Sequence, residues 1–289
     1  MSDRLQPILV WATLAALVIV LCTGILLSWY YVPLAQQGVQ HGSASAAAAS
    51  VRSIEVDVVG GHVVRALHHH ATSVLVASAL LWLLLMLWQW RGDRRLWWSV
   101  LGLVVIALVG AWTGRLLPDD AYAATSREVM RYGLREAHGG GVVATLLGLR
   151  TLPAAALANT YALHSIMLLL ASITAYAAIR RYVEPVTLKT AGIVVGAGML
   201  SVLLAATQHL AVPGSPADIA PAKPWWMFLP LHYGTELLGA ELMSIILGMM
   251  LAALLTLPWW TDRVRPITRA VVSAAIVLLY IGLLFDAVW

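Results

Sequence analysis

Long apolar runs recur along this chain, and each is about as long as a helix that crosses a lipid bilayer. Such a helix needs about 20 mostly apolar residues. Only 11% of the 289 residues are charged, against about 25% in an average soluble domain. The sequence therefore predicts an all-α polytopic membrane protein with about seven transmembrane helices. The runs span residues 8–32, 67–90, 96–117, 154–181, 189–212, 235–260 and 267–288, each bound being approximate.

The basic residues are divided unevenly between the two sides of these runs. Three short connections carry nine of the 18 basic residues: Arg91, Arg94, Arg95, Arg180, Arg181, Lys189, Arg263, Arg265 and Arg269. The positive-inside rule assigns basic loops to the cytoplasm. We therefore expect a multi-pass protein embedded in the lipid of a bacterial inner membrane, with a cytoplasmic N-terminus and a periplasmic C-terminus. Because the charge is divided by membrane side, it does not indicate a nucleic-acid partner.

Two of the long connections contain helical patterns. Residues 51–60 place Val51, Ile54 and Val58 on one side, which suits an interfacial helix lying on the membrane. A second helical stretch is expected at about 120–136, and Gly139-Gly140-Gly141 then breaks it.

In this topology all histidines fall in outer loops or in the outer halves of apolar runs. They are His41, His62, His68, His69, His70, His138, His164, His209 and His232. Ionisable residues inside a membrane usually serve a functional site, because they are costly there. His68 and His164 lie inside two runs that both lead from outside to inside, so their imidazoles can meet at similar depth.

Facing neutral imidazoles in a helical bundle can hold the iron of a b-type haem. Arg65 lies one helical turn nearer the surface than His68, where it is placed to pair with a haem propionate. The alternative is that each histidine only hydrogen-bonds to a neighbouring helix or to water, but the matched pair favours haem ligation. His69 and His70 point about 100° and 200° away from His68. They are expected to be packing or surface groups, with His69 a fallback ligand.

Four stretches resemble the cytochrome b subunit of quinol–cytochrome c oxidoreductases. Ser50 to Ser73 follows the family's run into its second helix, with the spacing Arg-x-x-His at Arg65 and His68. Gly114-Arg115-Leu116-Leu117-Pro118 resembles the family's Gly-Tyr-x-Leu-Pro, and Asn159 to His164 resembles its Arg-Phe-x-x-Leu-His. Pro224 to Pro230 resembles its Pro-Glu-Trp-Tyr region. The resemblance implies a cytochrome b-like four-helix haem bundle over 1–187 and a three-helix C-terminal part over 188–289.

The departures from the family pattern are equally informative. The family has a second, inner haem, whose ligands lie fourteen residues after the outer ones; here those positions hold Trp82 and Ala178. The family's outer haem packs against two glycines, which correspond to Gly24 and Gly114. The inner pair of glycines is replaced by Val10 and Val100. The resemblance therefore implies one haem b, bound by His68, His164, Arg65, Gly24 and Gly114, with the two histidines as axial iron ligands.

A further departure concerns the loop glutamate that helps take up a quinol proton in the family. Trp225 stands in its place, and Glu236 and Glu241 are weak candidates to replace it. The resemblance implies an electron-transfer subunit that passes electrons between a quinone or quinol and a periplasmic Rieske or c-type cytochrome subunit. It would belong to a quinol-linked oxidoreductase within a larger respiratory complex.

Two other functions remain open. The chain would alternatively be a degenerate, non-catalytic cytochrome b paralogue that anchors extrinsic redox subunits. In that role it would pair with a complete cytochrome b as a heterodimer, or with itself. A membrane anchor of the formate-dehydrogenase or nitrate-reductase type is disfavoured by the loop motif and by the outer placement of the histidines.

Overall fold

The computed structural model describes residues 2–33, 45–89, 93–136, 140–146, 153–179, 192, 196 and 229–260. Within these ranges every regular element is a helix, which confirms the predicted all-α class. Five of the described helices are long and apolar enough to cross a membrane. The chain is therefore an integral membrane protein. The predicted spans at 189–212 and 267–288 lie outside the described residues, apart from the two helical positions 192 and 196.

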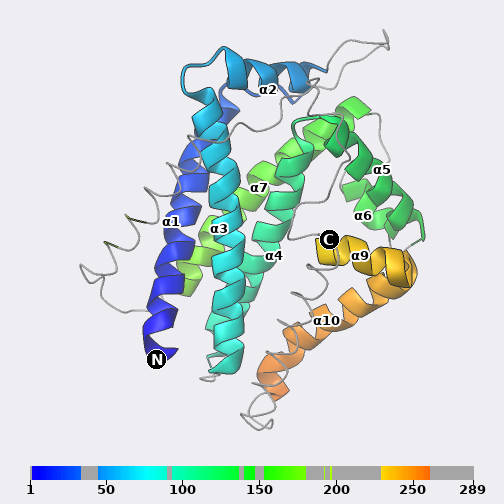
Figure 1. Ribbon diagram of the computed structural model, residues 1–289. Helices are drawn as coiled ribbons and strands as arrows, with labels where there is room; N and C mark the ends of the chain where they lie inside the picture. Colours follow the sequence, from blue (N-terminus) through cyan, green and yellow to red (C-terminus); the bar gives the residue numbers. More distant parts are fainter. Residues whose placement is uncertain are drawn as a thin grey trace.

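Four long helices form a bundle from two tightly packed pairs (Figure 1). In the first pair, α1 (Ser2–Ser28) packs against α3 (Gly61–Trp88); in the second, α4 (Arg94–Leu116) packs against α7 (Pro153–Ile179). Contacts between α3 and α4 join the pairs. Successive bundle helices run in opposite directions, so residues late in α1 and α4 lie level with residues early in α3 and α7.

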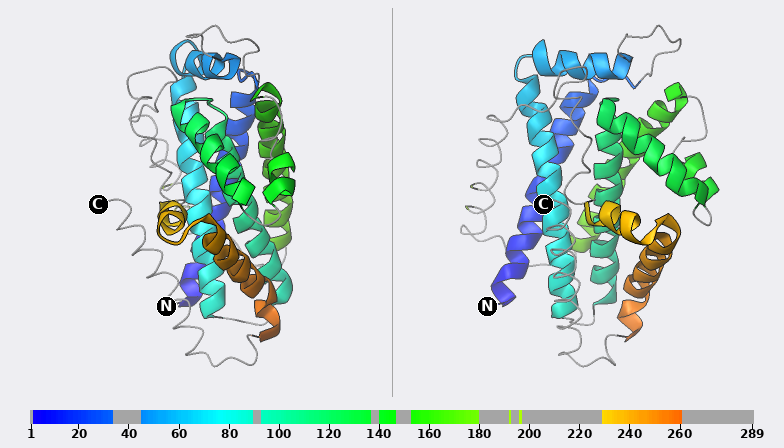
Figure 2. Two further views of the ribbon diagram at one scale, coloured as in Figure 1. Left: turned by 90° about the vertical axis from the view of Figure 1, so that its right-hand side faces the viewer. Right: turned by 45° about the vertical axis from the view of Figure 1, so that its right-hand side comes forward.

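A short helix, α2 (Ala46–Val56), lies across one end of this bundle in all three views (Figures 1 and 2). We call the bundle half next to α2 the α2 half and the other half the far half. Ser45 caps α2 by accepting a hydrogen bond from the Ala48 amide at 3.1 Å. Val51 and Ile54 are buried beneath the helix. The pattern predicted at 51–60 therefore belongs to a helix that begins and ends earlier.

The chain turns sharply from α2 into α3. Gly60 has a φ of +72°, and a Cβ at Gly61 would lie 1.9 Å from the Ile54 carbonyl oxygen. Only glycine fits both requirements at no steric cost. This turn allows α3 to begin at Gly61, six residues before the predicted start of the second span.

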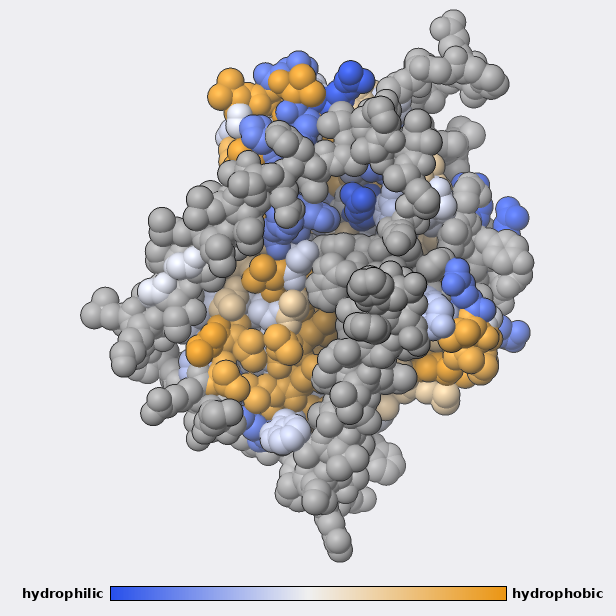
Figure 3. All heavy atoms as spheres, in the orientation of Figure 1, coloured by the Kyte–Doolittle hydropathy of each residue, from blue (hydrophilic) through white to orange (hydrophobic). Residues whose placement is uncertain are grey.

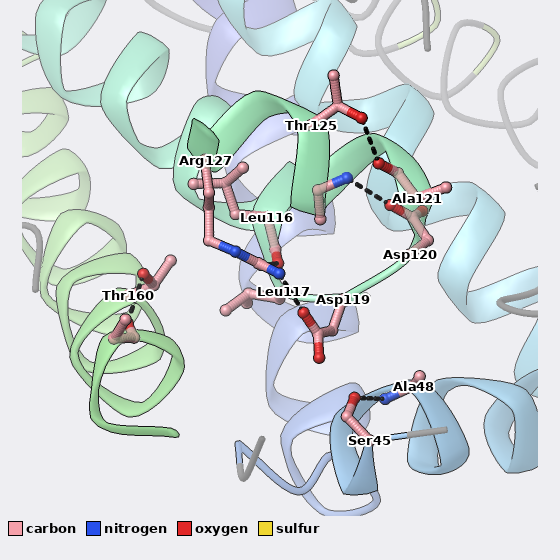
Figure 4. A network of polar contacts seen from close by, with 12 residues as sticks. Ser45, Ala48, Leu116, Leu117, Asp119, Asp120, Ala121, Thr125, Arg127 and Thr160 are labelled. Atoms are coloured by element: carbon pink, nitrogen blue, oxygen red, sulfur yellow. Dashed lines mark hydrogen bonds and ion pairs between the residues drawn. The ribbon is translucent and has the colours of Figure 1, made fainter. Parts of the chain in front are cut away.

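The connection after α4 holds two helices, α5 (Ala121–Glu136) and α6 (Gly140–Leu146). The prediction of a helix at 120–136 is thus confirmed, and α6 begins within the predicted glycine break, at Gly140. Asp120 caps α5 by accepting from the Ala123 amide at 2.8 Å. Arg127 forms an ion pair with Asp119 and donates to the Leu116 carbonyl at 3.3 Å (Figure 4). These bonds tie α5 to the end of α4.

Two further described helices follow, α9 (Leu229–Leu238) and α10 (Ala240–Trp260). The buried Trp97 indole on α4 donates to the Leu254 carbonyl of α10 at 3.1 Å. In the space-filling view, hydrophobic side chains gather over the far half of the bundle, whereas hydrophilic ones lie toward α2 (Figure 3).

Candidate functional site

The two histidines singled out in the sequence face each other across the bundle. The ring centres of His68 on α3 and His164 on α7 are 6.2 Å apart, and their planes are inclined by 67°. Both rings line one cavity in the α2 half. The structure thus brings together two residues that are 96 positions apart in the sequence, at the common depth that the topology predicts.

Hydrogen bonds define which nitrogen of each ring carries a proton. His164 Nδ1 lies 2.9 Å from the Gly110 carbonyl oxygen. A carbonyl can only accept, so Nδ1 donates and a neutral ring keeps its lone pair at Nε2. The Thr23 hydroxyl donates to the Ile19 carbonyl at 2.6 Å, and its oxygen is therefore free to accept from His68 Nδ1 at 2.9 Å. Each imidazole thus has its Nε2 lone pair available to a ligand.

A glycine lies directly against each ring. A Cβ added at Gly24 would be 3.2 Å from His68 Cε1, and one at Gly114 would be 2.8 Å from His164 Cε1. The second distance is shorter than non-bonded carbon atoms tolerate. By contrast, a Cβ at Gly110 or Gly102, also on α4, would meet its nearest neighbour at 3.5 or 3.7 Å. Gly24 and Gly114 therefore leave the space that the rings of His68 and His164 occupy.

The residue before each of these glycines is a threonine, and both threonines contact the same rings. Thr113 Oγ1 lies 3.3 Å from His164 Nδ1 and mirrors the contact of Thr23 with His68. The sequence reasoning missed both residues. The available signal was the repeated Thr-Gly pair at 23–24 and 113–114, near the ends of two helices that pack beside the histidine helices.

Arg65 lines the cavity, but it already has a partner. Its Nη1 lies 2.9 Å from Glu55 Oε2, and the two side chains are only 9% and 4% exposed. Glu55, on α2, was not anticipated from the sequence. An ion pair this buried holds its members together, because removing one partner leaves an uncompensated charge. The pair therefore fixes α2 on the start of α3.

Most side chains lining the cavity are apolar, and Tyr31 is among the polar ones. Tyr31 donates to the Leu117 carbonyl at 2.8 Å, and its ring centre lies 5.3 Å from that of Tyr161. Burial, followed by the nearby Asp119 carboxylate, raises the pKa of the Tyr31 phenol. The phenol therefore stays protonated at neutral pH.

The other histidines divide into those that line the cavity, those on α3 that do not, and those outside the described part of the chain. His69 lines the cavity as well, and its expected role as a packing group or fallback ligand stays a prediction. His62, in the first turn of α3, does not line the cavity. His70 does not line it and lies with its ring centre 5.6 Å from that of His69. His41, His138 and His209 lie outside the described residues, and the side chain of His232 is not described.

At the corresponding positions, the far half is filled by buried apolar side chains. Trp82 and Ala178 stand where the resemblance would put a second ligand pair, and they are 1% and 0% exposed. Val10 and Val100 belong to the same buried apolar cluster. The four side chains thus help to close-pack the volume that a second cofactor would need.

Among the comparisons with known proteins, only the comparison with solved structures gives a match. No protein-family model matches the chain, and no curated protein matches it. Among solved structures, a chain described as "Hyperthermophilic respiratory Complex III" matches with a TM-score of 0.73 at 16% sequence identity. The match covers 98% of this chain and 84% of that one. The likeness shows a shared fold over almost the whole chain.

Proposed function

We propose that the chain is a membrane subunit of a respiratory electron-transfer complex and holds one b-type haem between His68 and His164. The observation that carries the proposal is the imidazole pair, 6.2 Å apart, with Nδ1 of each ring engaged by a hydrogen bond. The fold shared with a respiratory Complex III chain supports the wider assignment. With the orientation expected from the loop charges, the site lies near the periplasmic face.

The spacing of the rings suits a metal ion between them. A metal–imidazole bond is about 2 Å long and the ring centre lies about 1 Å further, so two rings on opposite sides of one ion are about 6 Å apart. Among the described residues no group of three or more His, Cys, Asp or Glu side chains gathers as a ligand set. A macrocycle that brings its own nitrogens therefore fits this pair better than a bare ion.

The surrounding residues have separate roles in this proposal. Gly24 and Gly114 give the rings room, Thr23 and the Gly110 carbonyl orient them, and the apolar lining limits access of water. Bonds of this kind from the non-coordinating nitrogen hold a ligating histidine in place. The cavity is partly open, and its volume of about 180 Å³ is only slightly larger than that of a cavity that takes benzene. A porphyrin is larger than this volume, so part of it would have to extend through the open side of the cavity.

A bound haem would supply one-electron transfer. The packed far half offers no second site at Trp82 and Ala178, so we expect electrons to enter and leave on the α2 side. The reductant would be a quinol, or the oxidant a quinone, with a periplasmic Rieske or c-type cytochrome subunit as the other partner.

The first experiment is a pyridine haemochrome assay on the purified chain. One haem per chain is expected, and zero or two would overturn the proposal. His68→Ala and His164→Ala should each abolish the b-type spectrum, since each removes one of the two imidazoles that would hold the iron. His70→Ala is the matched control, because its ring does not line the cavity. His69→Ala tests the fallback ligand and should keep the spectrum.

A second function, non-catalytic anchoring of redox subunits, is favoured by one observation. Glu236 and Glu241, the candidates to replace the loop glutamate, are exposed on α9 and α10 and do not line the cavity. Rapid mixing of the haem-loaded chain with a short-chain hydroquinone separates the two functions. Reduction of the haem by the hydroquinone, or oxidation of the reduced haem by the matching quinone, supports the electron-transfer role, whereas a loaded chain that exchanges electrons with neither supports the anchor.

A further inference from the structure

Three arginines near the cavity differ in how their charge is met. Arg65 pairs with Glu55, and Arg127 pairs with Asp119. Arg115, in the last turn of α4, has no carboxylate partner among the described residues. Its guanidinium carbon lies 4.6 Å from the ring centre of Tyr122 on α5. The Asp120 cap and the Arg127 bonds that fix α5 are visible in Figure 4.

The contact with Tyr122 positions Arg115 without using its hydrogen-bond donors. A cation over an aromatic ring is attracted to the face of that ring, while the guanidinium N–H groups point outward in their own plane. Those donors form a fork that matches the two oxygens of a carboxylate. Arg115 also lines the cavity that His68 and His164 line.

We propose that Arg115 binds a carboxylate of the group held in this cavity, which for a b-type haem is a propionate. The inference rests on the proposed function and deepens it. Arg115 would then replace Arg65 in the role that the sequence suggested, because Glu55 already neutralises Arg65. In the resembled family motif this position is a tyrosine, so the assignment is particular to this chain.

Two other roles for Arg115 make different predictions. A cation in the last turn of a helix stabilises that end through the helix dipole, and this role requires no bound carboxylate. A phosphate of an anionic lipid offers similar oxygens to a guanidinium. The experiment must therefore ask whether Arg115 responds to the carboxylates of the cofactor itself.

The test compares haem with its dimethyl ester, in which both propionates are neutral. The full-length protein is loaded with each, and release into excess haem-binding globin is timed. The unchanged chain should keep haem about tenfold longer than the ester, because one charge-assisted bond is lost. In Arg115→Gln the two release rates should become equal. Arg127→Gln, which removes a paired cation outside the cavity lining, should preserve the tenfold difference.

A redox titration gives a second readout. Loss of a positive charge beside the site should move the midpoint potential of the haem to a lower value in Arg115→Gln, and Arg115→Lys should restore most of it. Phospholipid that copurifies with each variant is measured by its phosphorus content. Loss of bound lipid with unchanged haem release would assign Arg115 to a lipid phosphate and overturn the inference.

The outcomes separate this inference from the proposed function. An unchanged chain that binds no haem refutes the proposed function and the inference together. A chain that binds one haem but releases haem and ester equally refutes the inference alone, and this comparison requires no variant to fold. An Arg115→Gln protein that still discriminates between haem and ester also refutes it.

Discussion

The same four helices form both halves of the bundle, but the α2 half holds a cavity and the far half is packed with apolar side chains. In the α2 half Gly24 and Gly114 leave room for two imidazoles, whereas Val10 and Val100 fill the corresponding places in the far half. The positions that correspond to His68 and His164 in the far half hold Trp82 and Ala178. Each counterpart is fourteen residues away along its own helix. Fourteen residues make about four turns, so each pair shares one helix face about 21 Å apart.

The difference teaches how little distinguishes a cavity from a packed core within one scaffold. In the α2 half, Gly24 and Gly114 have no Cβ atoms, and hydrogen bonds hold the two histidine rings beside them. Together these features leave a cavity. Two β-branched side chains and one indole help to close the far half, at exposures of 2% or less. Since protein interiors pack as densely as organic crystals, such exchanges decide whether a group fits.

The largest expected effect comes from adding one methyl group to the α2 half. In Gly114→Ala the new Cβ would lie 2.8 Å from His164 Cε1, so the ring must leave its present position. We expect haem content to fall from one per chain to nearly zero, measured by the pyridine haemochrome assay.

Gly102→Ala is the matched control for that change, on the same helix. Its Cβ would meet Thr174 at 3.7 Å, an ordinary contact. Both substitutions gain about 1 kcal/mol of intrinsic helix propensity, so propensity cannot explain a difference between them. Equal haem content in the two variants would contradict the claim that His164 binds only when position 114 has no side chain.

The apolar runs along single helices were sufficient to predict the helical class, and their directions predicted that His68 and His164 meet at one depth. The replacement of the four far-half residues came only from the resemblance to cytochrome b, because nothing else in the sequence marks those positions. The sequence did not reveal the pairing of Arg65 with Glu55, because that contact depends on how the Gly60–Gly61 turn folds α2 onto α3. Nor did it single out Arg115, since an arginine in the last turn of a helix ordinarily needs no ligand.

A smaller effect is expected in the far half, and on stability rather than on cofactor content. Trp82→Ala removes a side chain that is 1% exposed, and large-to-small changes of this kind cost about 3–5 kcal/mol. The free energy of unfolding in detergent should fall by that amount while one haem per chain remains.

Trp88→Ala, six residues further along α3, provides the comparison for that result. Trp88 is 53% exposed, and exposed substitutions usually change stability by less than about 0.5 kcal/mol. If Trp82→Ala instead emptied the haem site, the two halves would be coupled, and the description of them as separately packed would be wrong.

The smallest effect concerns the two threonines, which differ in what remains after their removal. In Thr113→Val the His164 ring keeps the Gly110 carbonyl at 2.9 Å, whereas Thr23→Val removes the 2.9 Å hydroxyl contact of His68. Loss of an orienting bond typically costs about 10–100-fold in metal affinity. Thr23→Val should therefore release haem about tenfold faster than the unchanged chain, at the low end of that range. Thr113→Val should speed haem release by less than about tenfold, below that range. Release into excess haem-binding globin measures both, and a larger effect at Thr113 would mean that its hydroxyl, rather than the Gly110 carbonyl, orients His164.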